Sequence, residues 1–358
     1  MRRDILELDT SISRSMEPLR LSLEDVEALR VLLAGGSVVD WHKAAFADLA
    51  SVDRLLRLHL MDPDDPQDQA RLRYLFDEAA SYVEEYLQLR IPPKLREVED
   101  VRDIFLWASN AQGFRRTQVL SCMILKLMHV LQHLEAADLR QHLSISDQEL
   151  QDAAHALVAN AADRMRRSGV PLVAFHGNRK SRMSVISKLL SKRDDVAARI
   201  FDKLRYRVIV PQETDVVAAL SWLVREVFPY NQIIPGQSRN NLLDPRALAD
   251  ALTPEEREQL QALVDDPVRA DTPTNEFSGR NYRMINFVTD IPIALPPDKL
   301  PDQDPLLLGR TVYVTVEFQL VDEQTAKDNE EGDNAHSKYK RRQFERVRDR
   351  LTRGQYLR

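Results

Sequence analysis

Two carboxylates lie at or inside segments whose apolar residues alternate as in β-strands, and they are the first candidates for catalytic residues. Asp202 comes just before the apolar stretch 204–210, and Glu317 interrupts the apolar stretch 311–321. Alternation along the second stretch turns Glu317 and Gln319 away from the apolar side chains of the other face. A carboxylate in such a place can bind Mg²⁺ together with phosphate oxygens, or act as a general base. The alternatives are a turn aspartate and an edge-strand glutamate that faces water.

A run of positive charge precedes Asp202. From His176 to Arg193 the chain carries several lysines and arginines and no acidic residue, after an expected strand at 170–175 and over an expected helix at 182–192. Cationic side chains close to a helix N-terminus favour a bound polyphosphate. The segment lacks the G-x-x-x-x-G-K-[ST] pattern of a Walker loop, and a solvated basic helix face is the alternative.

Helical periodicity covers the chain from Leu21 to about Arg167, with an expected helix start at Ser146 and Glu149, and the pattern changes after Gly169. Beyond that glycine, strands are expected at 170–175, 204–210, 230–235, 281–293 and 311–321, with helices at 182–192, 213–228 and from 322 to about 353. This order predicts an α+β fold. An all-helical domain (1–168) precedes a mixed-sheet domain (169–358), which has a surface insertion at about 240–275 and a basic C-terminal helix.

Composition limits the class of protein. The chain has 358 residues, 43% hydrophobic and 30% charged, which is typical of a globular protein of about two domains. The net charge of −6 confines any polyanion site to a local patch. The single cysteine, Cys122, excludes an internal disulfide, and with no secretory pattern after Met1 it predicts a cytoplasmic protein. The apolar stretch 117–134 is too short and too often interrupted for a membrane span, so a buried helix is expected.

Two histidines in that stretch raise the question of a metal site. His129 and His133 are four residues apart, on one face of the expected helix. No acidic residue separates them in the H-E-x-x-H manner, so packing or surface roles are favoured over metal binding.

Five short patterns in the second half occur in the order of a known family. The chain resembles the RelA/SpoT-like alarmone synthetases, which carry K-x-x-x-S-[IV]-x-x-K, D-x-x-x-x-R-[VI], Y-x-S-x-H, E-[IV]-Q-[IL]-R and H-x-K-Y-K in this order. The matching residues are Lys180, Ser184 and Lys188, then Asp202 and Arg207, Tyr282, Glu317 and Gln319, and finally His336, Lys338, Tyr339 and Lys340. The resemblance covers about residues 170–340 and leaves the helical half unexplained.

The resemblance implies a nucleotidyltransferase-like mixed sheet flanked by helices. It also implies a Mg²⁺-dependent pyrophosphokinase that transfers diphosphate from ATP to the 3′-hydroxyl of a guanine nucleotide, the alarmone synthesis of the stringent response. Asp202 and Glu317 would hold the metal, and Glu317 would also deprotonate the hydroxyl. The residues implied for ATP are Arg179, Lys180, Arg182, Ser184 and Lys188. Those implied for the acceptor are Tyr282, Gln319, His336, Lys338 and Lys340.

The chain departs from the family patterns at five positions, most of them on the acceptor side: Asn178, Met284, Asn286, Val321 and Ala326. Two alternatives therefore stay open. One is a toxin-like relative that modifies tRNA or an adenine nucleotide, and the other is a catalytically inactive regulator that binds nucleotide or RNA. Hydrolase activity is not expected, because the chain contains no His-Asp dipeptide.

The last segment is basic. Ser337 to Arg358 holds nine lysines and arginines against two acidic residues, which suits contact with RNA or the ribosome. Phe344, Val347 and Leu351 follow helical spacing and predict instead that one face of this tail packs on the domain. The sequence leaves the role of the helical half and a homo-oligomeric state open.

Overall fold

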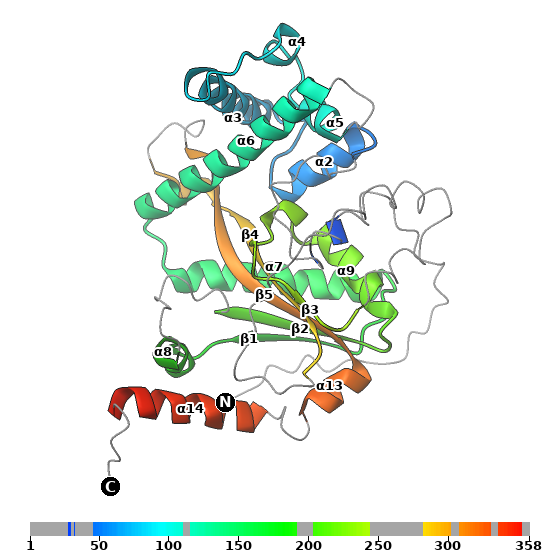
Figure 1. Ribbon diagram of the computed structural model, residues 1–358, viewed down its shortest axis with the longest axis vertical. Helices are drawn as coiled ribbons and strands as arrows, with labels where there is room; N and C mark the ends of the chain where they lie inside the picture. Colours follow the sequence, from blue (N-terminus) through cyan, green and yellow to red (C-terminus); the bar gives the residue numbers. More distant parts are fainter. Residues whose placement is uncertain are drawn as a thin grey trace.

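The fold begins with helices and continues as a mixed sheet with helices around it (Figure 1). The computed structural model describes residues 28–29, 32, 46–109, 115–191, 203–243, 282–301, 308–330 and 336–352. The α+β class expected from the sequence is confirmed. Most of the expected insertion at 240–275 lies outside the described residues.

The helical half contains α2 (Leu49–Leu58), α3 (Pro66–Glu85), α4 (Pro93–Arg96), α5 (Asp103–Ser109), α6 (Arg115–His142) and α7 (Asp147–Arg167). The predicted start of α7 is confirmed as a capping box. The hydroxyl of Ser146 accepts from the Glu149 backbone N–H at 3.2 Å, and the Glu149 carboxylate accepts from the Ser146 backbone N–H at 2.8 Å. Gly169, with a φ of 84°, follows the helix in the left-handed region that ends many helices.

The sheet has five strands within the described residues: β1 (Ala174–Arg179), β2 (Leu204–Val210), β3 (Arg239–Asn240), β4 (Ile285–Ala294) and β5 (Thr311–Asp322). Their order is β1-β2-β5-β4-β3, with β2 and β5 parallel and the other pairs antiparallel. The strands predicted at 204–210, 281–293 and 311–321 are confirmed by β2, β4 and β5. The first strand begins at Ala174, four residues later than expected.

The second half also contains α8 (Arg182–Ser191), α9 (Asp215–Glu226), α13 (Glu323–Glu330), α14 (His336–Thr352) and the short 3₁₀ helices η3 (Tyr230–Gln232) and η4 (Pro297–Lys299). The strand expected at 230–235 is wrong, because Tyr230–Gln232 form η3 and Ile233 makes an isolated bridge with Thr289. The physical reason lies in two side chains. The amide oxygens of Asn231 and Gln232 are bonded to His59 and His133 of the helical half.

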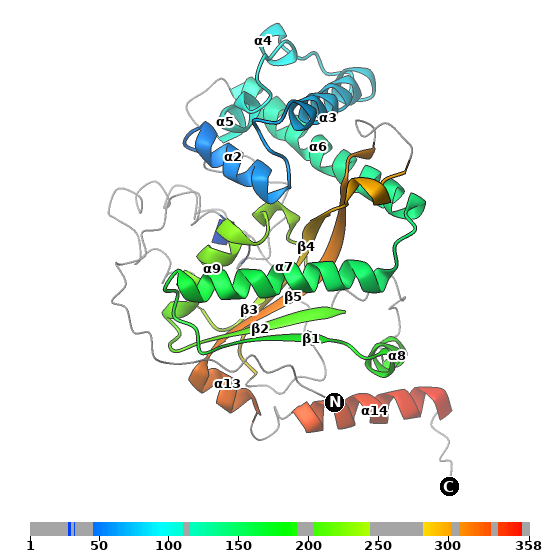
Figure 2. The same cartoon turned by 180° about the vertical axis from the view of Figure 1, so that it is seen from behind.

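Two hydrophobic cores organise the described residues. One lies among α2, α3, α5 and the first half of α6. The other joins the sheet to α9 and α7, and α7 lies across the face of the sheet (Figure 2). The α7 residues in the second core are Leu150, Ala154, Val158, Ala161, Ala162 and Met165. The domain boundary at residue 168 stays a prediction, and the core of the sheet extends across it.

Helix α6 is long and apolar enough, by length and composition, to cross a membrane. Its buried residues Leu120, Ile124, Leu125 and Met128 belong to the helical core, and His133 near its C-terminal end stacks on Tyr313 of β5 at 4.5 Å. The helix therefore has packing partners on both the helical half and the sheet, but Val119, Val130 and Leu134 are exposed, so the helix expected to be buried is only partly so.

Helix α14 lies beside α8 in both views (Figures 1 and 2). The tail helix packs on the domain as predicted, but not through the predicted face: Phe344 is 55% exposed, Leu351 is 63% exposed and Val347 is half-buried. Gln343 is buried instead, among the side chains of this helix that the structure describes, and its amide oxygen accepts from Lys340 Nζ at 3.1 Å.

Candidate functional site

The face of the sheet opposite α7 is polar. On β2, Leu204, Tyr206, Val208 and Val210 enter the core shared with α7, so the alternate residues face the other way. Strand pairing sets His176 opposite Arg207 and Asn178 opposite Arg205, and it sets Arg205 opposite Glu317. The polar residues of this face include His176, Asn178, Arg205, Arg207, Asn286, Glu317 and Gln319. A mixed sheet thus gathers cations, amides and carboxylates on a single surface, since Asp290, opposite Thr315, lies on the same face as Glu317.

Glu317 is the most enclosed of these side chains, with the residue 5% exposed. Its Oε1 accepts hydrogen bonds from Asn286 Nδ2 and from Gln319 Nε2, the latter at 3.0 Å. Its Oε2 accepts from Arg205 Nε at 2.8 Å. The carboxylate that the sequence singled out therefore sits among three donors, one of them cationic, and both of its oxygens are engaged.

Arg207 and Tyr282 stand next to each other on the same face. Arg207 Nη2 donates to the Tyr282 hydroxyl at 3.4 Å, and Arg207 Nη1 donates to Glu330 Oε1 at 3.4 Å. Tyr282 precedes β4, Arg207 lies on β2 and Glu330 ends α13. Three segments far apart in sequence thus meet here, and they include the arginine and the tyrosine expected at the site.

The residues expected at the ATP phosphates do not all come together. Arg179 is on the α7 side of β1, exposed, and donates to Asp152 of α7 at 2.5 Å. Lys180 follows β1 and is half-buried. Ser184 is in the first turn of α8, where its backbone N–H donates to the hydroxyl of Ser181 at 3.3 Å. The structure therefore separates Arg179 from Glu317 by the thickness of the sheet.

Several expected residues are placed only in part. Arg182 and Lys188 lie on α8, and His336 and Lys338 on α14, but their side chains are outside what the structure describes. Asp202 lies outside the described residues altogether. Lys340 is half-buried on α14. The roles assigned to these residues stay predictions.

Three of the departures from the family patterns lie in one place. Met284, Val321 and Ala326 form a small buried cluster, against which Ile209 and Tyr282 pack. Because these three side chains are apolar, the part of the site beside Tyr282 offers van der Waals contact instead of hydrogen bonds. The other two are polar: Asn286 bonds to Glu317, and Asn178 lies opposite Arg205.

The structure is similar to those of small alarmone synthetases. Small alarmone synthetase 1 from Bacillus subtilis, bound to its product pppGpp, has 12% sequence identity and a TM-score of 0.29, over 60% of this chain and 88% of that one. A GTP pyrophosphokinase family protein from Streptococcus pneumoniae has 13% identity and a TM-score of 0.30, over 58% and 88% of the two chains. Small alarmone synthetase 2 from B. subtilis has 14% identity and a TM-score of 0.28, over 56% and 94%. No family model and no curated protein sequence matches the chain.

A magnesium ion at Glu317 would need an oxygen with a lone pair directed at the metal. In this conformation both oxygens accept from N–H donors. Within the described ranges, no group of three His, Cys, Asp or Glu side chains is placed to hold a metal ion. The three donors leave one lone-pair site, on Oε2 directly beside the guanidinium of Arg205, and repulsion between two cations makes this site a poor fit for a metal while Arg205 stays where it is.

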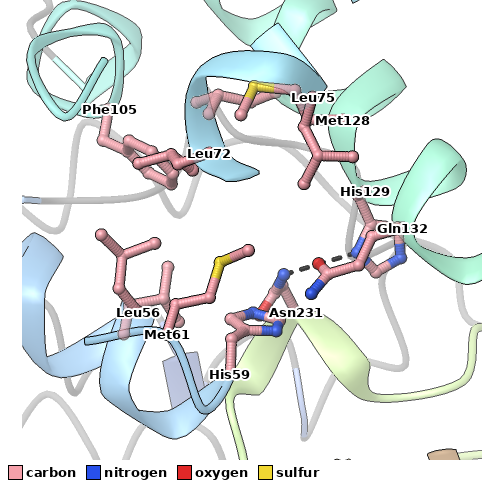
Figure 3. A pocket seen from close by; sticks show the side chains of 12 residues that line it. Leu56, His59, Met61, Leu72, Leu75, Phe105, Met128, His129, Gln132 and Asn231 are labelled. Carbon is pink, nitrogen blue, oxygen red and sulfur yellow. Dashed lines mark hydrogen bonds between the residues drawn. The ribbon is translucent and has the colours of Figure 1, made fainter. Parts of the chain in front are cut away.

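A second group of polar residues lies between the helical half and the sheet, at a small cavity (Figure 3). His59, His129, Gln132 and Asn231 gather on one side, and apolar side chains such as Leu72, Phe105 and Met128 line the other. The cavity measures about 40 Å³, room for roughly one or two water molecules. It is too small for a nucleotide, so it is not a second candidate for the nucleotide site.

His59 of that group and the neighbouring His133 bond to side-chain amides. His59 Nε2 lies 2.8 Å from Asn231 Oδ1, and His133 Nε2 lies 2.6 Å from Gln232 Oε1. Burial lowers the pKa of His59 to about 4 and that of His129 to about 3. His129 and His133 thus take part in packing between the two halves, the role that the sequence favoured.

Sequence reasoning missed Arg205 and the role of Asn286. Arg205 alternates with the apolar residues of β2, so its face was predictable. Its partner was not, because Arg205 and Glu317 are 112 positions apart and meet only through the register of β2 with β5.

Proposed function

We propose that the chain is a pyrophosphokinase of the alarmone-synthetase type, which transfers diphosphate from ATP to the 3′-hydroxyl of a guanine nucleotide. The observation that supports this most directly is the convergence on one sheet face of Glu317, Gln319, Arg207 and Tyr282. These four come from three of the five patterns that carry the resemblance. Their meeting gives a surface with one buried carboxylate, an aromatic ring and cationic donors.

Each group has a task that its chemistry suits. The ring of Tyr282 would stack on the acceptor base, and Arg207 beside it would bind acceptor phosphate oxygens. Lys180, with Arg182 and Lys188 on α8, would bind the ATP phosphates, which bring Mg²⁺ with them. Glu317 would accept the proton of the attacking hydroxyl once Oε2 is released by Arg205. Transfer of this kind depends mainly on positioning and charge neutralisation.

The second candidate function is a nucleotide-binding regulator without transfer. Two observations favour it: Arg205 holds the only carboxylate oxygen of Glu317 that is not bonded to an amide, and the surroundings of Tyr282 are apolar. A polyanion would still find Arg207 and Lys180 on such a surface. Contact of the basic helix α14 with RNA stays a prediction.

The experiment is a transfer assay with labelled ATP, Mg²⁺ and separate GDP, GTP, ADP and tRNA acceptors. Glu317→Gln should lower the transfer rate by about 10²-fold or more, the usual worth of a general base. Glu323→Gln is the matched control, since Glu323 is on α13 and pairs with Lys327 at 2.9 Å.

Absence of transfer to every acceptor would contradict the proposal. Calorimetric binding of a non-hydrolysable ATP analogue under the same conditions would then support the regulator. Transfer that Glu317→Gln leaves unchanged would contradict the assignment of the base.

A further inference from the structure

The two oxygens of the Glu317 carboxylate have different kinds of partner. Oε1 accepts from two neutral amides, Asn286 and Gln319. Oε2 accepts from the guanidinium of Arg205 at 2.8 Å. The amides come from β4 and from β5 itself, so Oε1 is fixed by neighbouring positions of the sheet, and only Oε2 faces a group that carries charge.

Burial makes this cation necessary. The Glu317 side chain is 7% exposed, and an enclosed carboxylate without a counter-ion is strongly unfavourable. Arg205 lies directly opposite Glu317 on the parallel strand β2 and is 31% exposed, so it reaches the carboxylate and still touches solvent. Its backbone position is fixed by the strand, whereas its long side chain can move. The pair therefore combines an enclosed anion with a cation at the edge of the solvent.

We propose that Arg205 is a built-in counter-ion which occupies the cation position at Glu317, so that the protein holds a divalent cation there only after Arg205 has moved away. Two physical reasons support this. The guanidinium of Arg205 already occupies one side of Oε2, and Oε1 is taken by two donors, so a metal ion could bind Glu317 only directly beside that cation. Two cations at one carboxylate would also repel each other.

The proposal rests on the proposed function for the choice of a divalent cation, and it adds a regulation to that site. The protein without nucleotide would bind divalent cations weakly at Glu317, because the guanidinium of Arg205 already occupies that position. A polyphosphate ligand would offer Arg205 a second partner, since guanidinium groups bind phosphate oxygens well. Arg205 would thus make divalent-cation binding at Glu317 depend on an earlier event at the site.

The test measures Mn²⁺ binding by isothermal titration calorimetry and by electron paramagnetic resonance of free Mn²⁺, without nucleotide, on the full chain. Arg205→Met should bind Mn²⁺ at least about tenfold more tightly than the wild type, the affinity equivalent of one charge-assisted hydrogen bond. Arg207→Met is the matched control. It removes the same charge from the same face, but Arg207 bonds to Glu330 and Tyr282 instead of Glu317. The double variant Arg205→Met with Glu317→Gln should lose the gain.

Three results would overturn the inference: wild-type binding as tight as that of Arg205→Met, an equal gain in Arg207→Met, or a gain that persists in the double variant. Arg205→Gln, which keeps a neutral donor, replaces Arg205→Met if the methionine variant does not fold. The outcome is separate from the transfer assay. Arg205→Met can bind Mn²⁺ more tightly even if the protein modifies no acceptor. Conversely, the protein can transfer diphosphate even if Arg205→Met binds Mn²⁺ no more tightly than the wild type.

Discussion

The buried histidine His59 makes the stability of the protein depend on pH. It follows α2, is 5% exposed, and lies 2.8 Å from the amide oxygen of Asn231 in η3. Burial lowers its pKa to about 4; the hydrogen bond to Asn231 opposes this shift and the neighbouring His133 adds to it. The perturbation is His59→Gln, which keeps a hydrogen-bonding amide and removes the titrating group.

The direction of the change in stability with pH follows from the protonation of His59 in the folded and the unfolded protein. The unfolded chain takes up a proton near the ordinary pKa of about 6.5, whereas the folded protein keeps His59 neutral down to about pH 4. Stability contributed by neutral His59 is therefore complete above pH 6.5 and is lost as the pH falls toward 4. Between pH 7 and pH 5 the loss amounts to about 2 kcal/mol, and it is insensitive to the folded pKa as long as that value stays below 5. His129, with a pKa of about 3, adds a loss of the same sign.

The assay is urea unfolding at pH 7 and pH 5, followed by tryptophan fluorescence, for the wild type and for His59→Gln. The variant should lose about 2 kcal/mol less than the wild type over this interval. Comparing the two losses cancels the titrating groups on which His59 has no effect, including Asp290, whose pKa is raised by burial. His142→Gln, at the exposed end of α6, is the matched control. If His59→Gln loses as much stability as the wild type, the argument from burial is refuted.

Two further variants test packing, both by urea unfolding at neutral pH. Glu135→Ala should cost about 3 kcal/mol, because Glu135 pairs with Arg71 where the side chains are 14% and 8% exposed; a loss below about 1 kcal/mol would mean that the pair behaves like a surface pair. Gly177→Ala should cost about 2–3 kcal/mol, because the new Cβ would lie 3.0 Å from Tyr206 Cε1. Gly236→Ala is the comparison without a clash, where the φ of 71° alone should cost about 1 kcal/mol, and equal costs would contradict the steric reason for Gly177.

Local pattern was sufficient for the longer elements of the sheet. β2 has the bounds that its alternation predicts, because apolar Leu204, Tyr206, Val208 and Val210 all face the core. The box at Ser146 marked the start of α7 for the same kind of reason: the residues that decide it lie within one turn. Such patterns depend only on residues that are close in sequence, so the elements that they predict are found in the structure.

What the sequence did not predict depends on partners far along the chain. β3 has two residues, too few for any periodicity. The apolar stretch around Ile233 resembled a strand, but Asn231 and Gln232 bond to His59 and His133, which lie roughly a hundred or more positions away. The pairing of Arg205 with Glu317 requires the register of two parallel strands. Alternation of apolar and polar residues along one segment does not predict which distant residues that segment will contact.

The packing of α7 on the sheet decides how the protein could be shortened. A fragment that began at residue 169 would lack the helix whose Leu150, Val158 and Met165 share a core with β2, β4 and β5. Its largest apolar face would then meet water, and aggregation of the expressed fragment is the physical expectation. A fragment that began just before Ser146 would keep both α7 and its capping box. The smallest soluble unit that carries the Glu317 site should therefore start on the helical side of Gly169.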